Sequence, residues 1–236
     1  MSRVHILLGI QTLIIFLGSV NRLSTLTQGY ALPNQFLRWT EIHNMLTLPL
    51  ISVTAFYVLK KLLERGATAA RPIASVLVST VFLMGVYIMG ASYGDHEVSN
   101  YLHGRFCDPV QPADASQRLC NIIIFNDDEF GHWTFFTGFV MINAAMLLVQ
   151  AMFRSVAQLT RRDAILLAVN GVFVGLGIFA NLGFEEIGLD LYVVIGLAAM
   201  SLFMLLRRGS QPMFVYYSVA YVLGIVLTGA VKLAQR

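Results

Sequence analysis

The chain has 236 residues, of which 57% are hydrophobic and 12% are charged, and its formal net charge is +3 at pH 7. A soluble domain usually carries about 25% charged residues, so this composition excludes an ordinary soluble fold. The basic residues gather in short connections between apolar segments, a pattern that sets membrane topology and does not indicate a nucleic-acid partner. We therefore expect a single polytopic membrane domain over residues 1–236.

Seven apolar segments follow one another, each close to the ~20 residues that a helix needs to cross a bilayer. Lipid cannot satisfy the open edge of a sheet, so these segments predict an all-α bundle of seven transmembrane helices. The first segment follows Arg3 as in a signal peptide, but no small-residue cleavage site is evident, and we expect it to be retained. The segments are Val4–Val20, His43–Leu63, Ala74–Ala91, His132–Met152, Ala164–Asn181, Leu191–Leu206 and Phe214–Val231.

The charges of the connections predict the orientation of the bundle. With the N-terminus inside, the inside segments hold ten of the 16 basic residues and only Glu64 and Asp163 among the acids. This asymmetry predicts an inside N-terminus and an outside C-terminus, in an inner or plasma membrane of the bacterial type. The inside basic residues are Arg3, Lys60, Lys61, Arg65, Arg71, Arg154, Arg161, Arg162, Arg207 and Arg208.

The longest connection is expected outside, over Gly94–Asn126, and contains Pro109 and Pro112. Its length and its prolines predict an irregular cap loop at residues 94–128. Both cysteines of the chain, Cys107 and Cys120, lie in it. Because the outside compartment is oxidising, we expect them to form a disulfide.

Isolated small and polar residues inside the predicted helices indicate how the helices pack. Gly171, Gly175 and Gly177 form a face of the small-xxx-small kind, which lets helices approach closely. Gln11, Asn143 and Asn170 are expected to make hydrogen bonds between helices, and His5 to lie at the inside interface.

Four of the five histidines lie at the outside ends of the second, third and fourth helices, in the company of acids. Ionisable groups are costly near lipid, so such a cluster points to a function. If the third helix continues past Gly94, His96, Asn100 and His103 share one face, at positions i, i+4 and i+7. Asp128 and His132 are likewise one turn apart.

Histidine and carboxylate ligands on facing helices are how bundles build metal sites. The sequence therefore predicts an outside-facing metal centre, for which zinc is the first choice and iron, copper or haem remain open. Asp95, Glu97 or Asp127 would orient the ligand imidazoles. The expected ligands are His43, His96, His103, His132 and Asp128.

Three short patterns resemble elements of the alkaline ceramidases and related seven-helix hydrolases of the CREST superfamily. Glu41-Ile-His-Asn44 resembles the first element, Ser92-Tyr-Gly-Asp-His96 the second and Asp127-Asp128-Glu129 the third. The resemblance implies a zinc-dependent membrane hydrolase. The chain departs from the family in lacking the final His-xxx-His pair, because no histidine follows His132, and the first element lies on the second helix.

These observations favour a membrane metalloenzyme that hydrolyses a hydrophobic, lipid-like substrate with metal-activated water. Asp128 or Glu41 would act as general base, and Ser92 would donate to the developing oxyanion. A redox subunit is the alternative, with a haem held axially by His43 and His132, or with copper or non-haem iron. A transporter, or a structural subunit in a homo-oligomer or larger membrane complex, is also open.

Overall fold

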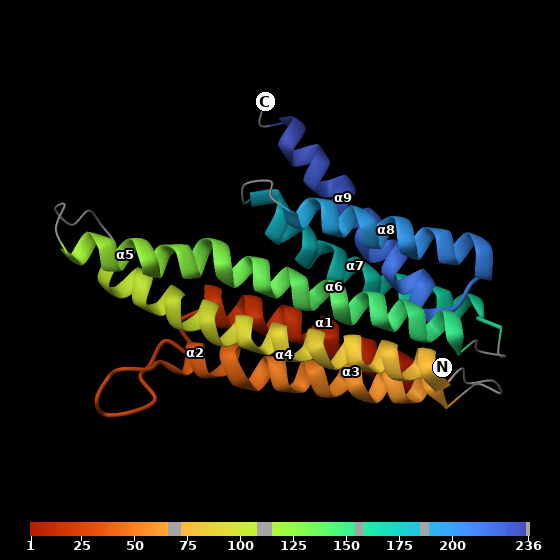
Figure 1. The fold of residues 1–236 in the computed structure, drawn as a ribbon, viewed down its shortest axis with the longest axis horizontal. Coiled ribbons are helices and arrows are strands. Elements are labelled where there is room, and N and C mark those ends of the chain that lie inside the picture. The colour runs from red at the N-terminus through yellow and green to blue at the C-terminus, as the bar shows by residue number, and fades with distance from the viewer. Residues whose placement is uncertain (66–71, 108–114, 154–157, 185–188, 235–236) are drawn as a thin grey trace.

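The computed structural model describes residues 1–65, 72–107, 115–153, 158–184 and 189–234. Within these ranges the chain is helical apart from the segment 24–38 and shorter connections, and seven helices are long and apolar enough to cross a membrane. The predicted all-α, multi-pass architecture is confirmed at this level, while the orientation of the termini stays a prediction. Figure 1 shows α1, α3, α4 and α6 running side by side along the long axis, with α7, α8 and α9 stacked on them and the end of α9 pointing away from that axis.

Two of the spans contain a π-helical segment between α-helices, and a third ends in one. The second span joins α2, η1 and α3, the third joins α4 and η2, and the fourth joins α5, η3 and α6. The elements are α1 (Ser2–Leu23), α2 (Trp39–Ile42), η1 (His43–Thr47), α3 (Leu48–Glu64), α4 (Pro72–Leu102), η2 (His103–Cys107), α5 (Ala115–Phe125), η3 (Asn126–Phe130), α6 (Gly131–Met152), α7 (Arg161–Phe184), α8 (Leu189–Arg208) and α9 (Pro212–Ala234).

The predicted cap loop at residues 94–128 is the main correction to the expected fold. The described part of this segment is helical, and the third and fourth spans are each 36 residues long. At 1.5 Å per residue each is about 54 Å, well beyond the ~30 Å hydrocarbon core. Figure 1 shows α4 and α5 extending past the other helices at one end. We call the paired helical ends Gly94–Cys107 and Ala115–Phe130 the projection.

The disulfide prediction is confirmed. Cys107 and Cys120 are bonded, with their Cα atoms 5.5 Å apart. Cys107 ends η2 and Cys120 lies in α5, so the bond joins the two sides of the projection near its tip. The covalent link therefore holds together two helix ends that extend beyond the neighbouring bundle.

Glycines allow two pairs of helices to pack closely: α4 with α6, and α7 with α9. A Cβ atom on Gly138 would lie 2.6 Å from the Met89 backbone nitrogen, so α6 packs directly on α4. Cβ atoms on Gly171 and Gly175 would each lie 2.8 Å from a backbone carbonyl of α9. The predicted glycine face of α7 is thus confirmed for these two residues, whereas Gly177 makes ordinary contact with Ile15 of α1.

Polar side chains join α1 to its neighbours. Gln11 donates to the Ser52 carbonyl at 2.9 Å, and Thr12 donates to Asn170 at 2.8 Å, which confirms both predicted interhelical bonds. Asn143 differs from expectation, because its amide donates to the Phe139 carbonyl of its own helix. His5 pairs with Asp163 at 2.8 Å, linking α1 to α7.

Replacing Cys107 and Cys120 with serine is expected to loosen the projection by about 3 kcal/mol, the loop-closure value for a bridge across 13 residues. Hydrogen exchange should accelerate in η2 and the end of α4, while α7, far from the bridge, serves as the internal control. Unchanged exchange in the projection would contradict this account, as would two free thiols in the wild-type protein by alkylation and mass spectrometry.

Candidate metal centre

A buried carboxylate, Asp127, lies between two histidines at the base of the projection. Its side chain is in η3 and the residue is 1% exposed. Its Oδ1 lies 2.9 Å from Nδ1 of His96, and its Oδ2 lies 2.8 Å from Nδ1 of His103. Asn100 also donates to Oδ2, at 3.3 Å. The predicted α4–η2 face of His96, Asn100 and His103 is therefore real, and it faces Asp127.

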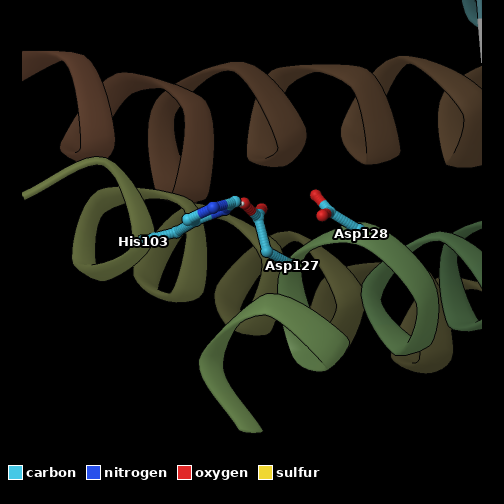
Figure 2. Close-up of side chains that lie close together, drawn as sticks. All are labelled: His103, Asp127 and Asp128. Carbon is cyan, nitrogen blue, oxygen red and sulfur yellow. Dashed lines mark hydrogen bonds and ion pairs between the residues drawn. The ribbon is translucent and has the colours of Figure 1, made fainter. Parts of the chain in front are cut away.

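Three consecutive acids in the π-helical turn η3, Asp127, Asp128 and Glu129, differ in burial. A π-helix adds one residue to the turn, and such turns are frequent at functional sites. Here Asp127 is buried, whereas Asp128 and Glu129 are exposed. One ligand atom each from His103, Asp127 and Asp128 lie within 4.8 Å of one another. Figure 2 shows the His103 ring directed at the Asp127 carboxylate, with the Asp128 carboxylate beside them.

The donor set and its hydrogen bonding fit a transition-metal cation. Imidazole nitrogen and carboxylate oxygen are ligands that zinc and iron accept. Asp95 Oδ2, His96 Nδ1 and Asp127 Oδ1 are buried and have no hydrogen-bond partner among the described residues. The 2.9 Å approach of His96 to Asp127 is thus an ion-pair distance without hydrogen-bond geometry. His96 Nδ1 and Asp127 Oδ1 face each other, so Asp95 Oδ2 is the buried atom left without a partner in the described part of the chain, at a cost of about 1–3 kcal/mol that a bound cation would offset.

The spacing requires a small rearrangement to hold an ion. Ligand bonds of 2.0–2.2 Å place neighbouring donor atoms of a tetrahedral zinc ion about 3.4 Å apart. His103 Nδ1 and Asp127 Oδ2 are closer than this, at 2.8 Å, and the donor atoms of the His103, Asp127 and Asp128 group all lie within 4.8 Å of one another. Asp128 is the exposed member, so rotation of its side chain is the simplest way to close the group.

The first turn of α6 packs tightly on α4 beside this centre. The His132 ring lies edge-on to the His96 ring, with centroids 5.0 Å apart. A Cβ atom on Gly131 would lie 3.1 Å from the His96 Cβ and 2.8 Å from the Asn126 carbonyl oxygen. Ser92 donates to the Gly131 carbonyl at 2.6 Å. Its hydroxyl, predicted to stabilise an oxyanion, is buried and occupied in joining α4 to α6.

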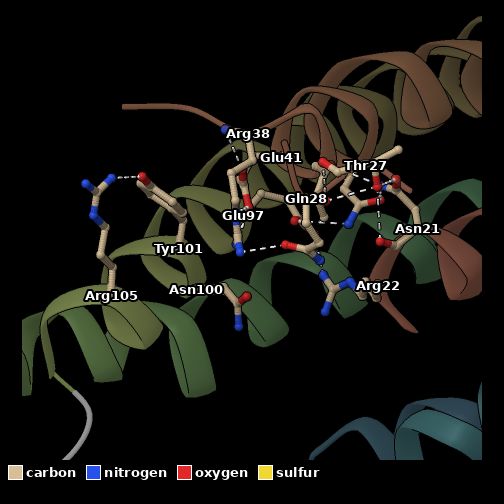
Figure 3. A network of polar contacts seen from close by, with 12 residues as sticks. Asn21, Arg22, Thr27, Gln28, Arg38, Glu41, Glu97, Asn100, Tyr101 and Arg105 are labelled. Carbon is tan, nitrogen blue, oxygen red and sulfur yellow. Dashed lines mark hydrogen bonds and ion pairs between the residues drawn. The ribbon is translucent and has the colours of Figure 1, made fainter. Parts of the chain in front are cut away.

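Glu41, the other predicted general base, belongs to a separate polar network. Its carboxylate accepts from the backbone and side chain of Arg38 at 2.9 Å each, which caps the start of α2. Asn44 donates to Glu97 at 3.2 Å and accepts from Asn21 at 2.7 Å. Glu97 is 4% exposed and also pairs with Arg22 of α1. Figure 3 shows this network joining α1, the start of the second span and α4.

His43 is the predicted ligand that the structure does not bring to the centre. Among the described residues its ring stacks on Trp39, with centroids 6.0 Å apart, and its Nδ1 lies 3.2 Å from the Thr47 hydroxyl. Both partners are in its own helical segment. The expected axial pairing of His43 with His132 around a haem therefore has no support in these contacts.

Comparisons of this chain with protein-family models, curated proteins and solved structures find no match. The class that the fold defines is a multi-pass membrane protein with a histidine–carboxylate cluster around a buried aspartate. The resemblance to the CREST hydrolases stays a prediction.

Enlarging Gly131 is expected to push η3 and α6 away from His96. Gly131→Ala would overpack the contact by about 1–3 kcal/mol and lower the unfolding temperature in detergent. Gly94→Ala is the matched control, because a Cβ at Gly94 meets no atom within 4 Å. Its stability should change by less than about 0.5 kcal/mol. Equal unfolding temperatures for the two variants would show that the close contact at Gly131 has no energetic role.

Glu41→Gln is expected to lower the stability of the protein without changing its metal content. The variant removes the charged acceptor of Arg38, which should lower stability by roughly 1–2 kcal/mol and leave bound metal unchanged. Glu129→Gln, which changes an exposed acid next to the centre, is the control for the loss of one negative charge. Loss of metal from the Glu41 variant at unchanged stability would place Glu41 in the metal centre instead.

Proposed function

We propose that this protein is a membrane metalloenzyme whose metal is held by His96, His103 and Asp127, with Asp128 and His132 completing the site. The observation that carries the proposal is the burial of Asp127 between two imidazoles, each facing one carboxylate oxygen. Buried charges in proteins are paired or coordinate metals. Asp95 Oδ2, which is buried without a hydrogen-bond partner among the described residues, supports coordination of a metal in addition to pairing with the imidazoles.

Zinc is the ion we propose, and hydrolysis is the proposed chemistry. A bound zinc ion would supply an activated water and polarise the substrate carbonyl. Asp128 is exposed at the centre and would take the proton from the attacking water. Asp127 would share the ion with the two imidazoles that face its oxygens. Ser92 and Glu41 are left out of this proposal, since other contacts occupy both.

The proposed substrate is amphipathic and lipid-like. Aromatic side chains next to the centre support this, because tryptophan favours the boundary between lipid and water and phenylalanine favours the apolar side of it. Phe130 and Trp133 flank Gly131 and His132, and Trp133 is 51% exposed. Phe125 lies against both aromatic rings, with centroids 6.4 and 5.9 Å away. A lipid at this surface would have its polar group beside His132 and its chains along the apolar helices.

A non-haem iron oxidoreductase is the second candidate. Two histidines and one carboxylate with open positions are the usual ligand set of non-haem iron(II) oxygenases, and His96, His103 and Asp127 have this composition. The same residues would hold the ion in both candidates, so the identity of the metal separates them.

Elemental analysis of the purified protein should find about one equivalent of a transition metal. Asp127→Asn and His103→Ala should each weaken metal binding by at least roughly tenfold to a hundredfold. His43→Ala is the matched control and should keep its metal, because the ring contact and the hydrogen bond of His43, to Trp39 and Thr47, lie in its own segment. Asp128→Asn should lower hydrolysis of acyl-lipid substrates by about 10²–10⁴-fold.

The outcomes of this experiment divide the candidates. Zinc with a featureless visible spectrum supports the hydrolase, and iron without haem bands supports the oxidoreductase. A wild-type protein without stoichiometric metal, or equal metal loss from the His43 and His103 variants, would overturn the metal centre.

A further inference from the structure

A pocket of about 450 Å³ opens between α1 and α3, at the opposite end of α1 from the metal centre. Arg3 lines it, whereas Arg22 of the same helix pairs with Glu97 in the network beside the centre. These two arginines are 19 positions apart in α1, roughly 28 Å along the helix axis. Figure 1 places the N-terminus and α2 at opposite ends of the bundle, in agreement with this separation. The pocket is therefore a second site and not an extension of the first.

The wall of the pocket is apolar and faces outward from the bundle. It is formed by Ile6 and Leu7 of α1 and by Tyr57, Val58 and Leu62 of α3. Ile6 is 63% exposed and Tyr57 is 49% exposed, so neither is covered by another helix. In a membrane-spanning bundle such outward apolar side chains contact lipid chains.

Three cations line the same pocket: Arg3, Lys61 and Arg65. Lys61 is partly neutralised, because its Nζ lies 3.1 Å from Glu64 and 5.9 Å from the centre of the Tyr57 ring. Among the described residues no acid pairs with Arg3 or Arg65. The pocket thus combines uncompensated positive charge with an apolar wall.

We propose that this pocket binds an anionic phospholipid, with its phosphate between Arg3 and Arg65 and its acyl chains along Ile6 and Val58. Guanidinium groups match phosphate oxygens in geometry and charge, and basic pockets between transmembrane helices bind anionic head groups. A free anion would use the arginines but not the apolar wall, which favours a lipid. The volume is within the range of small-molecule sites and accommodates a head group with the first part of its chains.

The predicted topology is consistent with this ligand. It places the start of α1 and the end of α3 at the inside surface, where anionic lipids attract basic residues. The proposal does not depend on the metal centre, since no residue is common to the two sites.

The test is lipid retention by the full-length protein in detergent, measured by native mass spectrometry after mixing with phosphatidylglycerol or phosphatidylcholine. The wild-type protein should retain phosphatidylglycerol preferentially. Arg3→Gln/Arg65→Gln should weaken retention roughly tenfold or more, at about a factor of five for each basic residue removed. Arg161→Gln/Arg162→Gln, which removes two arginines from the start of α7 outside the pocket, is the matched control and should retain the lipid.

A second variant and a competitor test the apolar half of the site. Val58→Trp fills the pocket without changing charge and should also reduce retention, while a monodisperse elution profile shows that it is folded. Glycerol phosphate should not displace the bound lipid. Equal retention of both lipids by wild type, equal losses in the two double-arginine variants, or displacement by glycerol phosphate alone would each overturn the proposal.

Discussion

The burial of the Asp127 carboxylate between His96 and His103 is the constraint on which the arrangement of the projection depends. An isolated charge removed from water is very unfavourable, and pairing with nearby imidazoles or a cation is what makes its burial tolerable. Both histidines come from the α4–η2 rod, and Asp127 comes from η3. The pairing therefore requires the helical segments α4–η2 and α5–η3 to run side by side beyond the point where their apolar residues end.

Three features of the chain keep those rods together. Gly131 lets η3 and α6 approach the His96 backbone, and Ser92 adds a hydrogen bond across the same contact. The Cys107–Cys120 disulfide joins the rods near their tip. On the other side of α4, Glu97 connects to α1 and η1 through Arg22 and Asn44. The position of His96 and His103 is thus set from both faces of α4.

The sequence predicted two parts of the fold: the seven membrane spans, which follow from hydropathy, and the disulfide, which follows from the presence of two cysteines in one connection. Hydropathy located the seven spans, and the outside location expected for Cys107 and Cys120 predicted their bond. It did not predict that helix continues over Gly94–Cys107 and again over Ala115–Asn126, because hydropathy marks where an apolar surface ends and not where a helix ends. Polar residues and the nearby prolines Pro109 and Pro112 are typical of a loop, yet α4 ends only at Leu102.

The sequence also predicted only part of the candidate site: the face of α4 that carries the histidines, but not the acid that faces it. The i, i+4, i+7 spacing of His96, Asn100 and His103 correctly placed them on one face. Which acid faces them could not be read from three consecutive acids, because the π-turn at η3 changes the usual periodicity and buries Asp127. Ser92 and Glu41 have residue types suited to catalysis, but helix packing and helix capping use the same types.

X-ray absorption spectroscopy of the purified protein at the metal edge tests the central claim most directly. A metal held by His96, His103 and Asp127 should show only nitrogen and oxygen ligands at about 2.0–2.2 Å, with imidazole scattering from at least two histidines. That signal should disappear in Asp127→Asn. A sulfur-dominated shell, a metal without imidazole scattering, or the same spectrum in the Asp127 variant would contradict the account.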